Sequence, residues 1–228
     1  MSQVINSTMN SRTLTEVESK KILSKGGLPV VPHRFCSNPE EAVHSSKELS
    51  FPLVVKMVSK SVVHKSDIGG VVLNIQTPEE IRDACHQILK AVNNELVEGF
   101  LIEEMVDPGL EFIIGSFKDE SFGDLIMFGL GGVFTEVLKK FTLRSIPISE
   151  HDASAMVDHL KINDLLNGYR HLPTVDKQTL IEALLKIGGE NGVVTKNAEQ
   201  IKELDINPLI YNNEGAFIVD ASIVTNKP

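Results

Sequence analysis

The chain has 228 residues, of which 42% are hydrophobic and 23% charged, and its formal net charge at pH 7 is −9. That length can bury a substantial core in one large domain or in two lobes, and no apolar run approaches the roughly 18 residues of a membrane-spanning helix. The acidic balance, without a basic stripe, argues against a protein that binds the phosphate backbone of nucleic acid.

The polar segment 1–12 lacks the basic and apolar regions of a signal peptide, and we expect it to be flexible. Three helix starts follow it. The capping box Thr13-Leu14-Thr15-Glu16 predicts a helix that Gly26-Gly27 end. Asn38-Pro39 and Thr77-Pro78 predict two more starts, because proline is favoured at the first helical position.

The only cysteines, Cys36 and Cys85, show no CxxC spacing and no disulfide framework. We therefore expect reduced, structural thiols in a cytoplasmic protein. Cys85 also belongs to the apolar face of the helix that Thr77 begins, together with Ile81, Ala84 and Ile88 at helical spacing.

Apolar runs between turn residues predict the strands. They cover residues 51–58, 70–75, 100–106, 110–117, 124–128, 133–138, 203–211 and 216–221. Helices are predicted from Ser149, with Ala153, Met156, Val157 and Leu160 on one face, and over 176–188. We expect an α+β protein with one lobe over 13–98 and a second over 99–228.

The run Val54–Val58 and the loop that follows it are the most informative part of the chain. A lysine on a buried strand is costly unless an anion or a carboxylate meets it, so we interpret Lys56 as a phosphate contact. The alternative is a side chain whose charged end reaches solvent at the strand end. His64 stands in the polar loop, and neutral imidazole is a competent nucleophile near pH 7. It is a candidate phosphoryl acceptor, with an ordinary surface histidine as the alternative.

Three further sets of residues are candidates for ligand contacts: oxygen-bearing side chains, a glycine run and an arginine. Asp205 and Asn207 share one strand face, and Asp220 is expected on the partner strand of the closing hairpin. Such oxygen ligands suit Mg²⁺, although a polar hairpin face explains them too. The run Gly129-Leu130-Gly131-Gly132 permits close approach of a ligand or a plain β-turn, and it matches neither a P-loop nor a dinucleotide fingerprint. Arg144 is either a phosphoryl contact or a surface arginine.

The ordered set of motifs resembles one family. Its members are the ATP-grasp beta subunits of the ADP-forming acetate-CoA ligases, also called NDP-forming acyl-CoA synthetases. The matching segments are 56–59, 64–71, 101–106, 128–134, 148–153 and 203–209, within a stretch from about Leu14 to Asp220.

The resemblance implies a two-lobed ATP-grasp fold with the nucleotide between the lobes. It implies that backbone groups of Glu104 and Val106 pair with adenine, that Met105 packs near the base, and that Glu111 meets the ribose hydroxyls. The remaining implied ligand contacts are Lys56, Gly131 and Gly132 for the nucleotide, and Asn207 and Asp220 for Mg²⁺, with Asp205 as a less certain third metal ligand.

The implied reaction converts acyl-CoA, ADP and phosphate to carboxylic acid, CoA and ATP. His64 would accept a phosphoryl group from a CoA-binding alpha subunit, in an α2β2 hetero-oligomer, and carry it to ADP. Lys56, Arg144 and Mg²⁺ would balance the charge of the transfer. Two alternatives remain open from the residues: a free-standing ATP-grasp carboxylate-amine ligase, and a catalytically silent nucleotide-sensing module.

Overall fold

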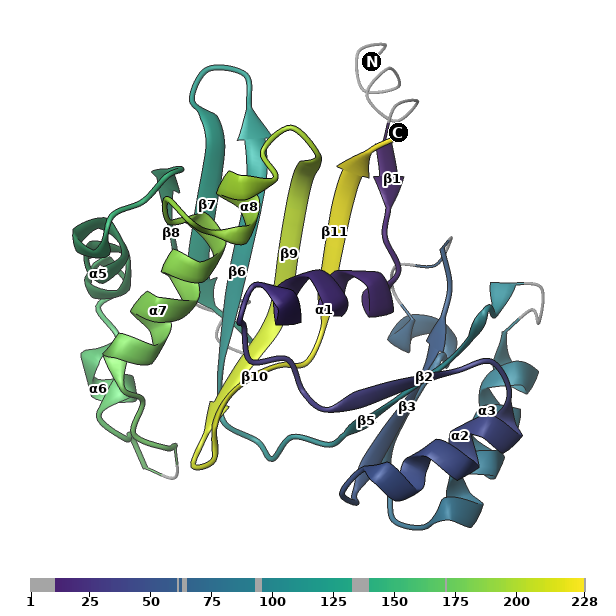
Figure 1. Cartoon of the computed structure of the whole chain (residues 1–228). Helices are drawn as coiled ribbons and strands as arrows, with labels where there is room; N and C mark the ends of the chain where they lie inside the picture. The colour runs from purple at the N-terminus through teal and green to yellow at the C-terminus, as the bar shows by residue number, and fades with distance from the viewer. Residues whose placement is uncertain are drawn as a thin grey trace. The chain divides into compact units, whose positions relative to one another are not determined.

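The computed structural model describes residues 11–60, 62, 65–92, 96–132, 140–170 and 172–227. Figure 1 labels its strands and helices. In chain order they are β1 (Ser11–Thr13), α1 (Glu16–Lys25), β2 (His33–Cys36), α2 (Pro39–Ser45), β3 (Leu53–Val58), β4 (Val71–Ile75), α3 (Pro78–Ala91), β5 (Gly99–Glu104), β6 (Leu110–Asp119), β7 (Gly123–Leu130), β8 (Phe141–Ser145), α5 (Glu150–His159), α6 (Asn163–Leu166), α7 (Lys177–Gly188), α8 (Val193–Lys196), β9 (Ile201–Asn212), β10 (Gly215–Ile218) and β11 (Ala221–Asn226).

The strands form two separate antiparallel sheets, which confirms the predicted α+β class. The larger sheet has the order β1-β11-β9-β6-β7-β8, with β10 paired to β9, and the smaller has the order β2-β5-β3-β4. Within the described residues no helix is long and apolar enough to cross a membrane.

The chain divides into two compact units. The small unit is Val31–Val106, and the large unit combines Met1–Val30 with Asp107–Pro228. This division differs from the expected lobes 13–98 and 99–228. The first helix belongs to the large unit because β1 pairs with β11 and Leu23 lies in the core of that unit. β5 belongs to the small unit because it pairs with β2 and β3.

The large sheet is covered by helices on one face. Figure 1 shows α1 and α7 crossing in front of it. Buried side chains of β6, β7 and β9, such as Phe112, Phe128 and Leu204, form one core with apolar residues of α1, α5, α7 and α8. We call this the helical face, and we call the opposite face of the same sheet the outer face. Because strand side chains alternate, Asp205, between the buried Leu204 and Ile206, and Asn207, which follows Ile206, belong to the outer face.

The small sheet packs one face against α2 and α3. Leu53, Val55 and Met57 of β3 lie in that core. The apolar positions predicted for α3 are confirmed, since Ile81, Ala84, Cys85 and Ile88 are all buried.

Most local signals are confirmed, and four expectations need comment. Asn38, Thr77 and Ser149 cap their helices as predicted, but the first capping box is Thr15 with Glu18, two residues later than expected. The closing hairpin is β9 with β10, and Asp220 lies in the connection to β11 rather than on the hairpin strand. The strand predicted at 133–138, and segment 1–10 of the expected flexible N-terminus, lie outside the described residues.

Candidate functional site

Lys56 forms a buried ion pair in the small unit. Lys56 is on β3 and Glu103 on β5, and the register, Val54 opposite Glu103 and Lys56 opposite Leu101, makes them diagonal neighbours on one face. The Lys56 Nζ lies 2.5 Å from the Glu103 Oε1, and the two side chains are 7% and 1% exposed. A carboxylate therefore compensates the buried lysine. The alternative of a lysine whose charged end reaches solvent does not describe the structure.

The residues predicted to bind adenine follow directly along β5. The Glu104 N–H donates to the Pro32 carbonyl at 3.1 Å, and the Met105 N–H donates to the Pro52 carbonyl at 2.9 Å. The Glu104 carboxylate accepts a hydrogen bond from the Ser50 N–H at 2.8 Å. Glu104, Met105 and Val106 are all half-buried. This segment is thus held in place by backbone contacts on both sides.

His64 lies outside the described residues, but the end of its loop is well defined. The Gly70 N–H donates to the Lys65 carbonyl, and the Met57 N–H donates to the Gly70 carbonyl, both at 2.8 Å. A Cβ at Gly70 would lie 2.6 Å from the Met57 Sδ. The loop therefore returns to β3 one residue after Lys56, through a position that only glycine fits.

In the large unit, Glu111 packs against the glycine run. The Gly131 N–H donates to the Glu111 carbonyl at 2.7 Å. A Cβ at Gly131 would lie 3.0 Å from the Glu111 Cβ, and one at Gly132 would lie 3.0 Å from the Glu111 Oε2. Gly132 also has φ +58°, which favours glycine. The structure therefore brings Glu111, Gly131 and Gly132 together, and the glycines are needed for this contact.

An acidic group occupies the outer face beside them. Asp205, Asn207 and Glu203 alternate along β9, and the Asn207 N–H donates to the Asp220 carbonyl at 3.2 Å. The pKa of Asp205 is raised, chiefly by burial of its carboxyl and then by the negative charges of Glu203 and Asp220. Glu203 was not selected from the sequence, although it lies two residues before Asp205, just as Asp205 lies two residues before Asn207. A divalent cation at this group would relieve the repulsion.

Arg144 does not join this group. It lies on β8 opposite the buried Ile126 of β7, so its side chain starts from the helical face. The pKa of Asp152 at the start of α5 is lowered by the hydrogen bonds from Ser149 and, to a smaller extent, by the charges of His151 and Arg144. Within the large unit, Arg144 therefore lies near α5, on the face opposite to Asp205 and Asn207, and its predicted contact with phosphoryl oxygens stays a prediction.

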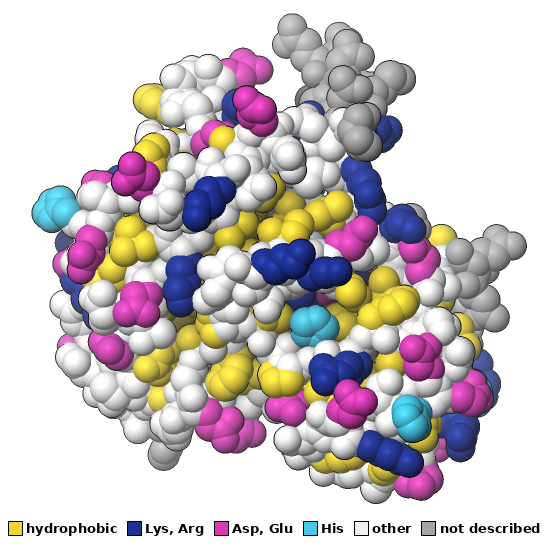
Figure 2. Space-filling view, in the orientation of Figure 1, with side chains coloured by type: hydrophobic (Ala, Val, Ile, Leu, Met, Phe, Trp, Pro, Cys, Tyr) yellow, Lys and Arg dark blue, Asp and Glu magenta, His cyan; other side chains and the backbone are white. Residues whose placement is uncertain are grey.

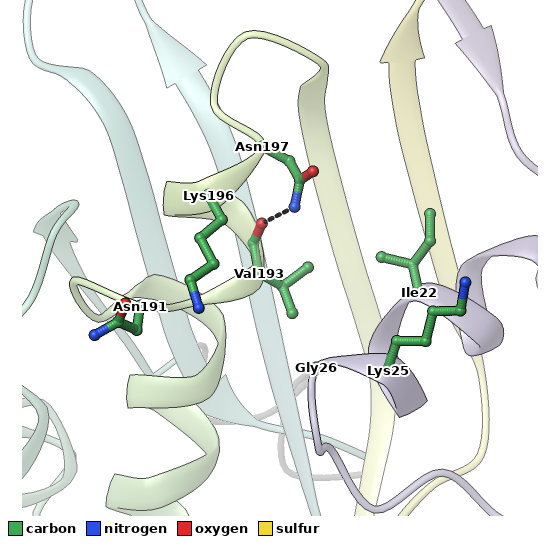
Figure 3. Close-up of a pocket in the computed structure, with 7 residues that line it drawn as sticks. All are labelled: Ile22, Lys25, Gly26, Asn191, Val193, Lys196 and Asn197. Atoms are coloured by element: carbon green, nitrogen blue, oxygen red, sulfur yellow. Dashed lines mark hydrogen bonds between the residues drawn. The ribbon is translucent and has the colours of Figure 1, made fainter.

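A cavity of about 390 Å³ lies elsewhere in the large unit, between the end of α1 and α8 (Figure 3). Its lining residues are Ile22, Lys25, Gly26, Asn191, Val193, Lys196 and Asn197. Figure 2 shows basic side chains on both sides of apolar surface in this part of the molecule. Both lysines are exposed, and none of the ligand-binding, catalytic or metal-binding residues predicted from the sequence lines the cavity. It is separate from the candidate site.

Comparison with known proteins identifies the family. Residues 6–225 match the model of the ATP-grasp domain family. The chain is 38% identical to the beta subunit of acetate-CoA ligase (ADP-forming) I of Pyrococcus furiosus, over 94% of this chain and 92% of that subunit. It is 39% identical to acetate-CoA ligase (ADP-forming) II of Archaeoglobus fulgidus, over 94% of this chain but only 30% of that longer protein.

A solved structure supports the same family. Acetyl-coenzyme A synthetase 1 of Ca. Korarchaeum cryptofilum, in complex with coenzyme A and Mg-AMPPCP, superposes with a TM-score of 0.80 at 40% identity. The match covers 94% of this chain and 93% of that one. In that structure a phosphohistidine segment points towards the nucleotide binding site.

Proposed function

The chain belongs to the ATP-grasp beta subunits of the ADP-forming acetate-CoA ligases, which are acid-thiol ligases, and we propose that it binds the nucleotide in such an enzyme. The reaction proposed is acyl-CoA + ADP + phosphate to carboxylic acid + CoA + ATP. A CoA-binding alpha subunit would complete the enzyme as an α2β2 hetero-oligomer, with the nucleotide between the two ATP-grasp lobes. Near full-length coverage of a named beta subunit supports the subunit assignment over a free-standing ligase.

We assign the adenine contacts to the Glu104 carbonyl and the Val106 N–H. The N–H groups of Glu104 and Met105 already donate to Pro32 and Pro52, so they are committed within the small unit. Met105 is half-buried beside them and packs near the base in this proposal. Lys56 contributes a positive charge towards the phosphates while remaining paired with Glu103.

The arrangement of the outer face carries the proposal. Glu111 is on β6 beside β9, which carries Asp205 and Asn207, and the side chains of all three start from this face. Glu111 is assigned to the ribose hydroxyls, with Gly131 and Gly132 allowing close approach. Carboxylate and amide oxygens suit Mg²⁺, which bound phosphates help to coordinate. Asn207 and Asp220 would hold the metal, with Asp205 as a third ligand. The pKa of Asp205 is raised chiefly by burial and then by the charges of Glu203 and Asp220, and a cation would offset those two charges.

His64 is the proposed phosphoryl carrier. A ring nitrogen of His64 would form the P–N bond as the donor's bond to phosphorus breaks, and ADP would later take the phosphoryl group and release the imidazole. A metal held by Asn207 and Asp220 would supply charge neutralisation during these transfers. The phosphohistidine segment of the Korarchaeum enzyme supports this assignment.

The metal assignment is tested by Asp220→Asn, with ADP binding measured by calorimetry in Mg²⁺ and in EDTA. We expect affinity for Mg-ADP to fall about tenfold or more, while affinity in EDTA changes less than about twofold. Asp164→Asn, at an exposed position on α6, is the matched control and should change neither. Equal losses in both buffers would assign Asp220 to folding instead.

A further inference from the structure

The exposed large apolar side chains of the large unit gather on three neighbouring strands. Phe117 on β6 is 37% exposed, Phe122 in the β6–β7 turn 71%, Phe141 on β8 57% and Leu143 on β8 37%. Among the described residues of this unit, only Tyr169 at 49% joins them in this class. Four of five exposed large apolar side chains therefore belong to one continuous part of the sheet.

The strand register places Phe117, Phe141 and Leu143 on one face. Phe117 stands opposite Leu125, Met127 opposite Leu143, and Gly129 opposite Phe141. Residues directly opposite in antiparallel strands point to the same side. We call Phe117, Leu125, Met127, Phe141 and Leu143 the apolar patch. It lies on the outer face, since the alternate residues of β6, β7 and β8 face the helices.

The apolar patch adjoins the acidic group of the proposed metal site. Gly115 of β6 is opposite Met127 on one side and opposite Asp205 on the other. A Cβ at Gly115 would lie 3.2 Å from the Met127 Cε, which shows that the Met127 side chain lies over β6. The patch therefore begins on the strand next to β9, where Phe117 stands opposite Glu203. Neighbouring strands are about 4.8 Å apart, so Met127 lies about two strand spacings from Asp205.

We propose that the apolar patch is the docking surface for the CoA-binding subunit, an inference that rests on the proposed function. In the Archaeoglobus relative the matching region is 30% of one polypeptide, whereas the Pyrococcus beta subunit is nearly matched end to end. A separate subunit must hold non-covalently the part that the longer chain joins covalently. A clustered apolar area of exposed side chains provides that contact. Docking there also brings the phosphoryl donor beside the acidic group.

The position of β8 strengthens the assignment. β8 is the last strand in the described order of the large sheet, paired only with β7 in that order. Edge strands with exposed apolar side chains associate with other chains unless something covers them. Phe141 and Leu143 are the two members of the patch on this strand, and a partner would bury both.

The test uses the double variant Phe141→Ser/Leu143→Ser and the purified CoA-binding alpha subunit from the same organism. Binding to the alpha subunit is measured by calorimetry, and Mg-ADP binding to the isolated chain reports the proposed nucleotide site. We expect affinity for the alpha subunit to fall about tenfold or more, because two apolar side chains lose their burial. Mg-ADP affinity and the melting temperature should stay close to those of the wild type.

Leu73→Ser is the matched control, because Leu73 is a 60% exposed leucine on β4, the edge strand of the small sheet. It should bind the alpha subunit normally.

Hydrogen exchange of the wild-type chain gives a test without any variant: amides of 141–145 should be protected when the alpha subunit is added. Unchanged alpha binding by the double variant, or no protection of β8, would overturn the proposal. A wild-type homodimer that the double variant abolishes would assign the patch to self-association and also overturn it. A wild-type chain that does not bind Mg-ADP would contradict the proposed function, independently of the docking proposal.

Discussion

The buried Lys56–Glu103 ion pair is costly both to form and to break. Each ion loses several kcal/mol of hydration free energy when it is buried. The attraction between the two charges offsets this loss only when their geometry is good. The 2.5 Å contact meets that condition, and the near-complete burial of both side chains makes it necessary. Glu103 thus stabilises the charge of a lysine that points away from the apolar core of its own unit.

We predict that Glu103→Gln lowers the free energy of unfolding by about 3 kcal/mol, because it removes the carboxylate charge that compensates the buried lysine. The double variant Lys56→Met/Glu103→Leu should recover most of that loss but bind ADP weakly. Chemical denaturation and calorimetry measure the two effects. The matched control is Glu98→Gln, which breaks the exposed Lys60–Glu98 pair and should cost less than about 1 kcal/mol. Equal costs for the two single variants would contradict this account.

Asp205 makes stability depend on pH in a definite direction. Its folded-state pKa is raised by burial, then by Glu203 and Asp220, so the folded protein disfavours the ionised carboxylate. The stabilisation from this group is present at acid pH and is lost as pH rises through the raised pKa. Asp205→Asn should therefore melt above the wild type at pH 7 to 8 in EDTA, with the advantage vanishing near pH 4. An advantage that does not change with pH would show that Asp205 does not titrate as argued.

The glycine segment after β7 shows how backbone shape and ligand chemistry meet in one element. Gly132 has positive φ and faces the Glu111 carboxylate at 3.0 Å from a would-be Cβ. A side chain there is both strained and in the way of Glu111. The same φ sign occurs at Gly27, where a Cβ would meet nothing within 4 Å.

Gly132→Ala should therefore lower stability by about 1 to 2 kcal/mol and also weaken ADP binding by displacing Glu111. Gly27→Ala isolates the strain, because it should cost a similar stability while leaving ADP binding unchanged. Thermal denaturation and calorimetry on both variants measure the two quantities. If Gly132→Ala kept full ADP affinity, the contact between Gly132 and Glu111 would have no part in the site.

Local signals predicted most elements, and long-range pairing accounts for what they missed. The sequence contains two overlapping capping boxes, at Thr13 and at Thr15, and the second is used because Thr13 pairs with Val224 of β11. No residue near Thr13 in the sequence indicates that it pairs with β11. The face of Arg144 depended in the same way on the register of β8 with β7, which places it opposite Ile126.

The candidate site was predictable where residues lie close along one strand, as for Asp205 and Asn207. It was not predictable where two strands meet. The partner of Lys56 was open between a carboxylate and an external anion, because Glu103 lies on another strand. The contact of Glu111 with Gly131 and Gly132 likewise joins β6 to the end of β7, although all three residues were selected.

The two units are not consecutive halves of the chain, and this has a measurable consequence. The small unit interrupts the large one, and both cysteines lie in the small unit. Burial raises the pKa of Cys85 to about 12 and also raises the pKa of Cys36. At pH 8 the Cys85 thiolate fraction is thus on the order of one in ten thousand.

Iodoacetamide should accordingly label neither thiol in the folded chain, and labelling should report unfolding of the small unit. We expect the rate at pH 8 to be at least about a hundredfold below that of the denatured protein, and saturating Mg-ADP should slow it further. Ser121→Cys, in the exposed β6–β7 turn, serves as the control and should react rapidly. Fast labelling of the native wild-type chain would contradict the buried placement.

The transfer of a phosphoryl group through His64 is tested most directly by labelling the purified chain with [γ-³²P]ATP and Mg²⁺. The account predicts an acid-labile, base-stable label on the wild-type chain, and no label on His64→Ala although that variant still binds Mg-ADP with wild-type affinity. A wild-type chain that binds Mg-ATP without acquiring label, or an undiminished label on His64→Ala, would contradict it.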